Sequence, residues 1–130
     1  MTHNDVIESA ITLAGEIYGV AGDDYSIRSR PLLALIYNQC DPLDRLWRQE
    51  NHLPESTWTP CTTIQNTGGD FPLSDAFLAP VPYALAALLT LDENPELSKF
   101  LYANYVETLA EIRRRIPAKV EKIADRYQLI

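Results

Sequence analysis

The first part of the chain carries apolar residues at helical intervals. After Thr2, apolar side chains recur every three or four positions, at Ile7, Ile11, Ala14 and Ile17 or Tyr18. This spacing places them on one face of a helix. Thr2 and Asp5 have the separation of a capping box, and Gly19 is a typical stop signal. The pattern predicts a first helix over residues 2–19, followed by a turn through GVAGDD.

The next apolar block, LLALIY, predicts a second helix that begins near Ser26 or Ser29 and ends near Cys40. Pro31 fits its first turn, where the missing N–H would be unpaired in any case. Because LLALIY is apolar nearly all round, we expect this helix to be central in the fold.

A short third helix is predicted from Asp41 to about Asn51. Asp41 is placed as its N-cap and Pro42 as its first helical residue, and both residue types are typical of helix starts. The inner stripe of this helix would be formed by Leu43, Leu46 and Trp47.

Residues 53–74 differ in composition from the helices around them. They include three prolines, five threonines and two adjacent glycines, but no basic residue. Their β-favouring residues suit extended backbone and NTGGD is a strong turn signal, so we predict an irregular, partly extended loop with room for a short β-hairpin. Connections of this length in compact domains are usually functional or disordered. The tryptophan, isoleucine and phenylalanine in this one favour order.

Two more helices are predicted after the loop. Ser74 can cap the fourth, and Pro80 and Pro82 imply either a distorted first turn or a start near Val81. After the DENP break, Pro95 opens a long fifth helix. Its inner face would hold Leu97, Leu101, Tyr105, Leu109 or Thr108, and Ile112.

Charged residues gather toward the end of the fifth helix. Glu107 and Glu111 are spaced to pair with Arg114 and Arg115. A proline then interrupts the helix, and residues 117–130 would add a loosely packed helical turn or two.

Together these patterns predict a mainly α fold, in which residues 1–130 form one domain, a small bundle of about five helices. The longest apolar run, residues 77–91, is too short to span a bilayer and holds two prolines. The first residues lack the basic and apolar segments of a secretory signal. We therefore expect the chain to fold in a cytoplasm and to make no membrane contact.

Charge and cysteine content narrow the function further. The net charge is −7, and residues 1–94 hold 13 acidic and 4 basic residues, against 5 and 7 in residues 95–130. An acidic body argues against a generic DNA-binding domain, and leaves contact with an acidic partner or self-assembly between acidic and basic faces. A reducing compartment favours two free, partly buried thiols at Cys40 and Cys61. A disulfide between them is the alternative.

No set of residues predicts catalysis or a cofactor. His52 and Cys61 could pair as base and nucleophile, but no signature surrounds them, and a surface histidine with a packed cysteine is the simpler interpretation. TGGD lacks the following lysine of a nucleotide loop. No cysteine has a second cysteine or a histidine at zinc spacing. We expect no enzyme activity, no cofactor and no metal.

Arg113, Arg114 and Arg115 cover most of a helical turn. One interpretation is a solvated face, paired with nearby glutamates and favourable near a helix C-terminus. The other is a contact with DNA or with an acidic neighbouring subunit. Both interpretations remain open.

Residues 71–115 resemble a known family. FPLSD precedes the Ala/Leu-rich YALAALLTLDENPEL, and KFLYANYVETLAEIRRR follows with an early tyrosine and late arginines. This order is similar to that in the head–tail connector (head-completion or adaptor) proteins of tailed bacteriophages. The matching residues are Phe71, Pro72, Leu73, Ala84, Leu85, Ala86, Leu88, Leu89, Tyr105 and Leu109.

The resemblance implies a structural virion protein of the neck, which joins the DNA-filled head to the tail. Such subunits form a homo-oligomeric ring beneath the portal, typically a dodecamer. They bind portal and tail or stopper proteins, and DNA passes through their channel. The arginines would contact that DNA or a neighbouring subunit. The loop would contact a subunit or the portal through Trp58, Thr59, Ile64 and Phe71. The alternative is a non-enzymatic helical interaction or regulatory protein, phage-encoded or bacterial.

Overall fold

The structure is a computed structural model that describes residues 1–15 and 23–116. Its helices are α1 (His3–Leu13), α2 (Asp23–Glu50), the 3₁₀-helix η1 (Asp75–Leu78), α3 (Pro80–Thr90) and α4 (Pro95–Arg114). The mainly α fold is confirmed, with four α-helices in the described residues instead of about five. These residues contain no strand, and one isolated antiparallel bridge joins Thr2 to Asp70.

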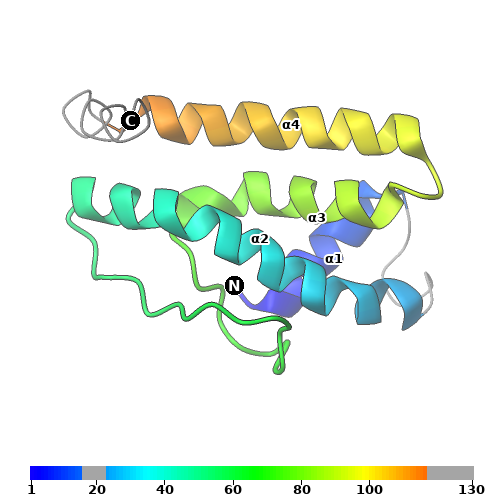
Figure 1. Cartoon of the computed structure of the whole chain (residues 1–130), viewed down its shortest axis with the longest axis horizontal. Coiled ribbons are helices and arrows are strands. Elements are labelled where there is room, and N and C mark those ends of the chain that lie inside the picture. The colour runs from blue at the N-terminus through cyan, green and yellow to red at the C-terminus, as the bar shows by residue number, and fades with distance from the viewer. Residues whose placement is uncertain (16–22, 117–130) are drawn as a thin grey trace, which may run out of the picture.

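Helix α3 lies at the centre of the fold. It packs extensively against α1, α2 and α4. In Figure 1, α4 lies along α3 on one side, and the loop after α2 hangs on the opposite side of the molecule. The sequence PVPYALAALLT is apolar nearly all round, so nine of the eleven residues of α3 are buried. The LLALIY segment of α2 is also buried at Leu33, Ile36 and Tyr37, but the most central helix is α3.

Helix α1 begins where the sequence predicts and ends earlier. The capping box is present, because the Thr2 hydroxyl accepts from the Asp5 N–H and the Asp5 carboxylate accepts from the Thr2 N–H at 2.9 Å. The helix ends at Leu13, and Gly15 then adopts φ 84°, a left-handed conformation that interrupts helical backbone. The predicted extension to Gly19 is therefore too long, and its remaining residues lie outside the described part of the chain.

The predicted break before Asp41 is wrong. Helix α2 continues through this position, with Pro31 and Pro42 in its interior. An interior proline costs about 3 kcal/mol or more. Burial on both sides of Pro42 offsets this cost, because Tyr37 and Asp44 are both fully buried in the same helix. The Asp41 carboxylate does not cap a new helix and instead accepts from Arg45 Nε at 2.8 Å.

The inner face of α2 beyond Pro42 differs from the predicted stripe. Leu43, Leu46 and Trp47 are half-buried, whereas Asp44 is fully buried. Apolar periodicity could not anticipate a buried carboxylate. Its burial is explained by the hydrogen bonds that it makes to the loop.

The starts of α3 and α4 agree with the sequence except that Ser74 does not cap α3. The 3₁₀-turn η1 precedes α3, which is the distorted-start alternative. Ser74 makes no side-chain cap, because its hydroxyl donates to Asp44 instead. Helix α4 begins with Pro95 at N1, and the Asn94 side chain accepts from the Leu97 N–H. On its inner face Leu101, Tyr105 and Ile112 are buried, and Leu97, Thr108 and Leu109 are half-buried.

The loop of residues 53–74 is irregular and contains no strand, so the short hairpin is not formed there. Backbone hydrogen bonds hold the loop against the start of α1. The His3 N–H donates to the Gly69 carbonyl at 3.0 Å, and the Asn4 N–H donates to the Thr67 carbonyl at 2.9 Å. The predicted helical segment 117–130 lies outside the described residues.

Candidate functional site

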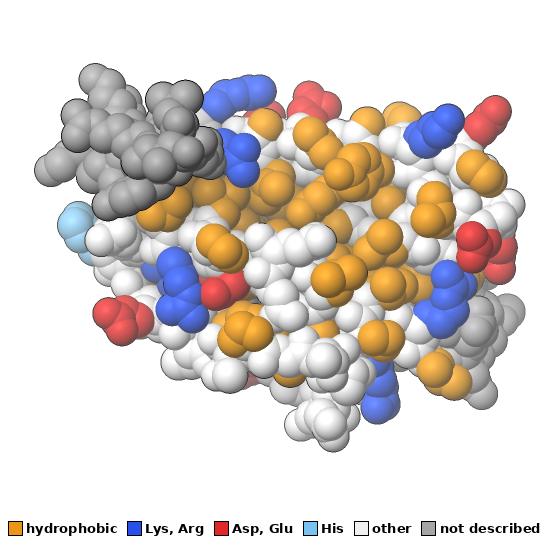
Figure 2. All heavy atoms as spheres, in the orientation of Figure 1, with side chains coloured by type: hydrophobic (Ala, Val, Ile, Leu, Met, Phe, Trp, Pro, Cys, Tyr) orange, Lys and Arg blue, Asp and Glu red, His pale blue; other side chains and the backbone are white. Residues whose placement is uncertain are grey.

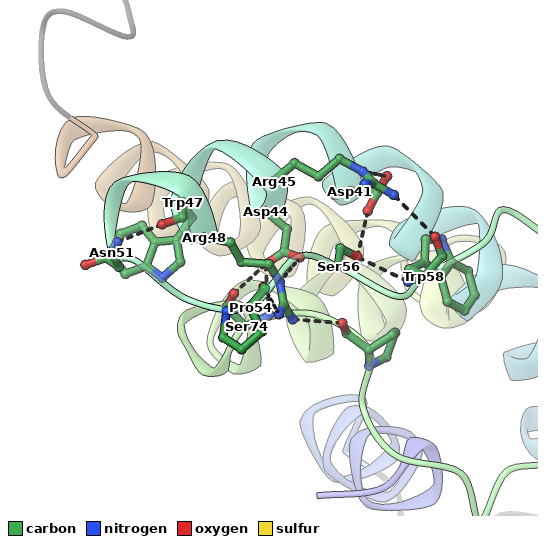
Figure 3. Close-up of polar contacts among 11 residues, drawn as sticks. Asp41, Asp44, Arg45, Trp47, Arg48, Asn51, Pro54, Ser56, Trp58 and Ser74 are labelled. Carbon is green, nitrogen blue, oxygen red and sulfur yellow. Dashed lines mark hydrogen bonds and ion pairs between the residues drawn. The ribbon is translucent and has the colours of Figure 1, made fainter.

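Both ends of the loop are attached to α2 by one buried ion pair. Asp44 is fully buried and accepts from Arg48 Nε at 2.8 Å, and from the N–H and hydroxyl of Ser74 at 2.9 and 2.6 Å. Arg48 also donates to the carbonyls of Pro54, at 3.0 Å, and Pro72, at 3.1 Å. Figure 3 shows these bonds converging on one turn of α2. Arg48 therefore joins the first and last parts of the loop, and Asp44 neutralises its charge.

A second, more exposed pair contacts the loop near its start, at Ser56 and Trp58. Asp41 and Arg45 are one helical turn before Asp44 and Arg48, and the Arg45 side chain is 49% exposed. Arg45 donates to the Trp58 carbonyl at 3.3 Å, and Ser56 donates to Asp41 at 3.4 Å (Figure 3). The hydrogen bond that Arg45 donates to Asp41 raises the pKa of Arg45. An ion pair this exposed contributes little stability.

The aromatic residues of the loop pack onto their own chain. Tyr37 of α2 is fully buried, and the rings of Trp58 and Phe71 meet it edge-on at centroid distances of 5.2 and 5.6 Å. Trp58 Nε1 also donates to the Asn38 side chain at 3.0 Å. Ile64 is buried in the core. Of the four loop residues predicted as an interface, Thr59 alone is exposed.

His3 completes this cluster from α1. Its Nδ1 and the Tyr37 hydroxyl are 2.9 Å apart, and the bond is buried. Burial lowers the pKa of His3, and the charge of Asp70 opposes this in part. Burial also raises the pKa of Tyr37 well above its ordinary value. The folded chain therefore favours the neutral form of the His3 side chain.

Within the described residues, His52 and Cys61, the candidate base and nucleophile of the sequence, form no hydrogen bond with each other. Cys61 is exposed and its thiol donates to the Thr63 carbonyl at 3.4 Å. His52 is also exposed, and its backbone adopts a left-handed conformation with φ 55°. Both cysteines are free, but Cys61 is exposed, which corrects the expectation of two partly buried thiols. Cys40 is buried, and burial raises its pKa to about 11.

The three arginines at the end of α4 are exposed. No ion pair within residues 23–116 joins Arg114 or Arg115 to Glu107 or Glu111, so the predicted helical pairing is wrong there. Helical spacing allows such pairs, but exposed long side chains gain little by forming them. The same helix turn contributes Arg113 to a groove described next.

An apolar groove, which the sequence did not reveal, runs between α2 and α4. It encloses about 480 Å³, and its floor is formed by Ala84 and Leu88 of α3. Figure 2 shows hydrophobic side chains gathered along this band. A second hollow of about 370 Å³ continues it along α4 to Lys99. The main apolar side chains of the walls are Leu35, Ile36, Tyr102, Tyr105, Val106 and Leu109.

Three of these wall residues are largely uncovered. Tyr102 is 57% exposed, Val106 48% and Leu35 47%. Part of the signal was present in the sequence, because Tyr102 and Val106 are four positions apart and Leu109 of the predicted inner face follows three positions later. Tyr102 and Val106 widen the apolar face of α4 beyond the predicted inner stripe.

Comparisons found no match to this chain among protein-family models, curated proteins or solved structures. Among the described residues, no helix combines the length and hydropathy needed to cross a membrane. The same residues contain no group of three or more His, Cys, Asp and Glu side chains placed to hold a metal ion.

Proposed function

We propose that this chain is a structural assembly subunit that binds other protein surfaces through the groove between α2 and α4. The observation that carries the proposal is the exposure of Leu35, Tyr102 and Val106 along one apolar face. Contiguous exposed apolar surface on a protein marks an interaction site. Covering it would gain about 25 cal/mol for each Å² removed from water.

An assembly role suits the groove better than catalysis. Its polar lining consists of Gln39, Arg113 and the hydroxyls of Tyr102 and Tyr105, with no carboxylate, histidine or cysteine. A catalytic site needs a nucleophile or base that converges with charge-stabilising groups. Burial raises the pKa of Tyr105 far above its ordinary value, so that hydroxyl stays protonated. A surface of this composition is suited to binding an apolar protein face.

The particular assembly proposed is the bacteriophage neck, with this chain as a head–tail connector. The support is the resemblance over residues 71–115, which fold as η1, α3 and α4 and so supply the floor and one wall of the groove. In a ring beneath the portal, a neighbouring subunit or the portal would cover the groove. Arg113, Arg114 and Arg115 would lie at that contact or face DNA in the channel. The ring would assemble in the host cytoplasm.

Co-expression with the portal protein of the same genome tests this function. We expect the chain to co-purify with portal particles and to add ring density beneath them in electron micrographs. Val106→Glu should abolish the attachment while leaving helical content unchanged, because Val106 is half exposed. Leu53→Glu, at 42% exposure on the loop side, is the matched control and should attach normally. A folded chain that never joins portal particles would contradict the connector role.

A further inference from the structure

The edge of α4 beside the groove carries residues at alternating intervals of three and four. Such spacing keeps residues on one seam, which is the arrangement that packs against another helix. All of the residues are exposed except Ala110, which is half-buried. The seam spans about 26 Å at 1.5 Å per residue. Its members are Glu96, Lys99, Ala103, Val106, Ala110 and Arg113.

We infer that two copies of this chain pair in solution through this seam, with their α4 helices antiparallel about a two-fold axis near the middle of the helix. In that register Glu96 of one copy faces the partner's Arg113. Ala103 faces the partner's Val106, which places small and apolar residues at the centre. The pair is isologous, since each copy contributes the same surface.

Charge selects the antiparallel direction and a second copy as the occupant. Parallel helices would bring Glu96 against Glu96 and Arg113 against Arg113, which is repulsive. Antiparallel helices place an acid opposite an arginine at both ends of the seam. Neither Glu96 nor Arg113 forms an ion pair within residues 23–116. Opposed helix dipoles favour the same direction.

The groove supplies the apolar part of this contact. Every seam residue except Glu96 lines the groove or its continuation, and Tyr102 lines both hollows. The side chains of Ala103 and Ala110 are small enough for a second helix to approach closely. A second α4 on the seam would therefore cover Val106 and Tyr102, two of the three exposed large apolar residues of the helix, the third being Phe100.

The inference concerns the free chain and goes beyond the proposed function. A two-fold contact joins only two copies, so a ring could not be extended through it. Assembly on a portal would exchange the two-fold partner for a different neighbour on the same face. Pairing in solution would meanwhile keep that apolar face covered.

Sedimentation equilibrium of the full chain over a range of concentrations is the first test. We expect a reversible species of twice the 14.7 kDa chain mass. Val106→Glu should remain monomeric at all concentrations with unchanged circular dichroism, whereas Leu53→Glu should still pair. A wild-type chain that stays monomeric overturns the inference.

Charge reversal tests the register and covers the case in which Val106→Glu fails to fold. Glu96→Arg alone and Arg113→Glu alone should each weaken pairing about ten-fold or more, because each creates two like-charge contacts in the pair. The double variant should restore pairing to near the wild-type value. Absence of this rescue overturns the antiparallel arrangement. Portal binding by a monomeric wild-type chain would refute the pair alone, and a pair that ignores the portal would refute the connector role alone.

Discussion

The loop side and the groove side of this molecule differ in how completely their side chains are packed or hydrogen-bonded within the chain. On the loop side, Asp44 holds Arg48 and Ser74 through three hydrogen bonds, and Tyr37 lies fully buried among aromatic neighbours. No buried side-chain nitrogen or oxygen in the described residues lacks a hydrogen-bond partner. The aromatic side chains and Ser74 of the unusual loop, residues 53–74, therefore make their contacts within the chain itself.

On the groove side, apolar side chains face water without a cover. Leu35, Tyr102 and Val106 line an open groove, although each is large enough to contribute to a core. An unusual composition, such as that of residues 53–74, therefore does not by itself identify a binding surface. An apolar face that is exposed to water does, because covering it with a partner gains free energy.

Removal of a loop-side aromatic should produce the largest loss of stability. Tyr37→Ala would leave a cavity beneath Trp58 and Phe71, and we expect the free energy of unfolding to fall by about 3–5 kcal/mol. Urea denaturation followed by circular dichroism measures this change. Tyr102→Ala on the groove side is the control, because Tyr102 is 57% exposed. Equal losses in the two variants would contradict the division between a packed side and an uncovered one.

The two ion pairs of α2 should separate clearly in stability. Asp44→Ala leaves Arg48 and Ser74 without their buried acceptor, so we expect a loss of about 3–5 kcal/mol. Asp41→Ala breaks an ion pair of the same 2.8 Å length and the same spacing. Because Arg45 is half exposed, this variant should lose much less stability. Unfolding of both variants in urea at one pH provides the comparison. If the exposed pair proved the more important, the loop would not be held as described.

Acid should weaken the loop side through His3. Because burial lowers the pKa of His3 in the folded state, protonation is more costly there than in the unfolded chain. Stability should therefore fall as the pH drops through the ordinary histidine value of 6.5, and His3 should have no such effect at higher pH. The groups that face it are Tyr37 and Asp70.

The His3 effect is isolated by comparison with His3→Gln, which keeps a polar partner for the Tyr37 hydroxyl. Urea unfolding of both proteins between about pH 8 and about pH 5 spans the ordinary histidine range. The wild-type curve should fall more steeply than that of the variant, since only it carries the titrating ring. Parallel curves would show that His3 does not feel the burial seen in the structure.

The sequence predicted what depends on local chemistry and missed what depends on partners distant in the chain. The capping box of Thr2 and the Pro95 start of α4 were predictable, because neighbouring residues determine them. The continuity of α2 through Pro42 was not, because burial of both halves outweighs a local helix-breaking signal. Burial of Asp44 depends on Ser74, 30 positions away. The groove requires α2 and α4 to flank α3, which no single periodicity encodes.

The central claim is that the edge of α4 beside the groove is a contact surface, and distances between spin labels on paired chains test it most directly. The labels would be attached at Glu107→Cys or Arg114→Cys in a Cys61→Ser background, since Cys61 is exposed and Cys40 is buried. Antiparallel pairing predicts a short separation at position 107. At position 114 it predicts labels offset by about 28 Å along the helix, at 1.5 Å per residue. Equal distances at the two positions, or no dipolar signal at either, would contradict the account.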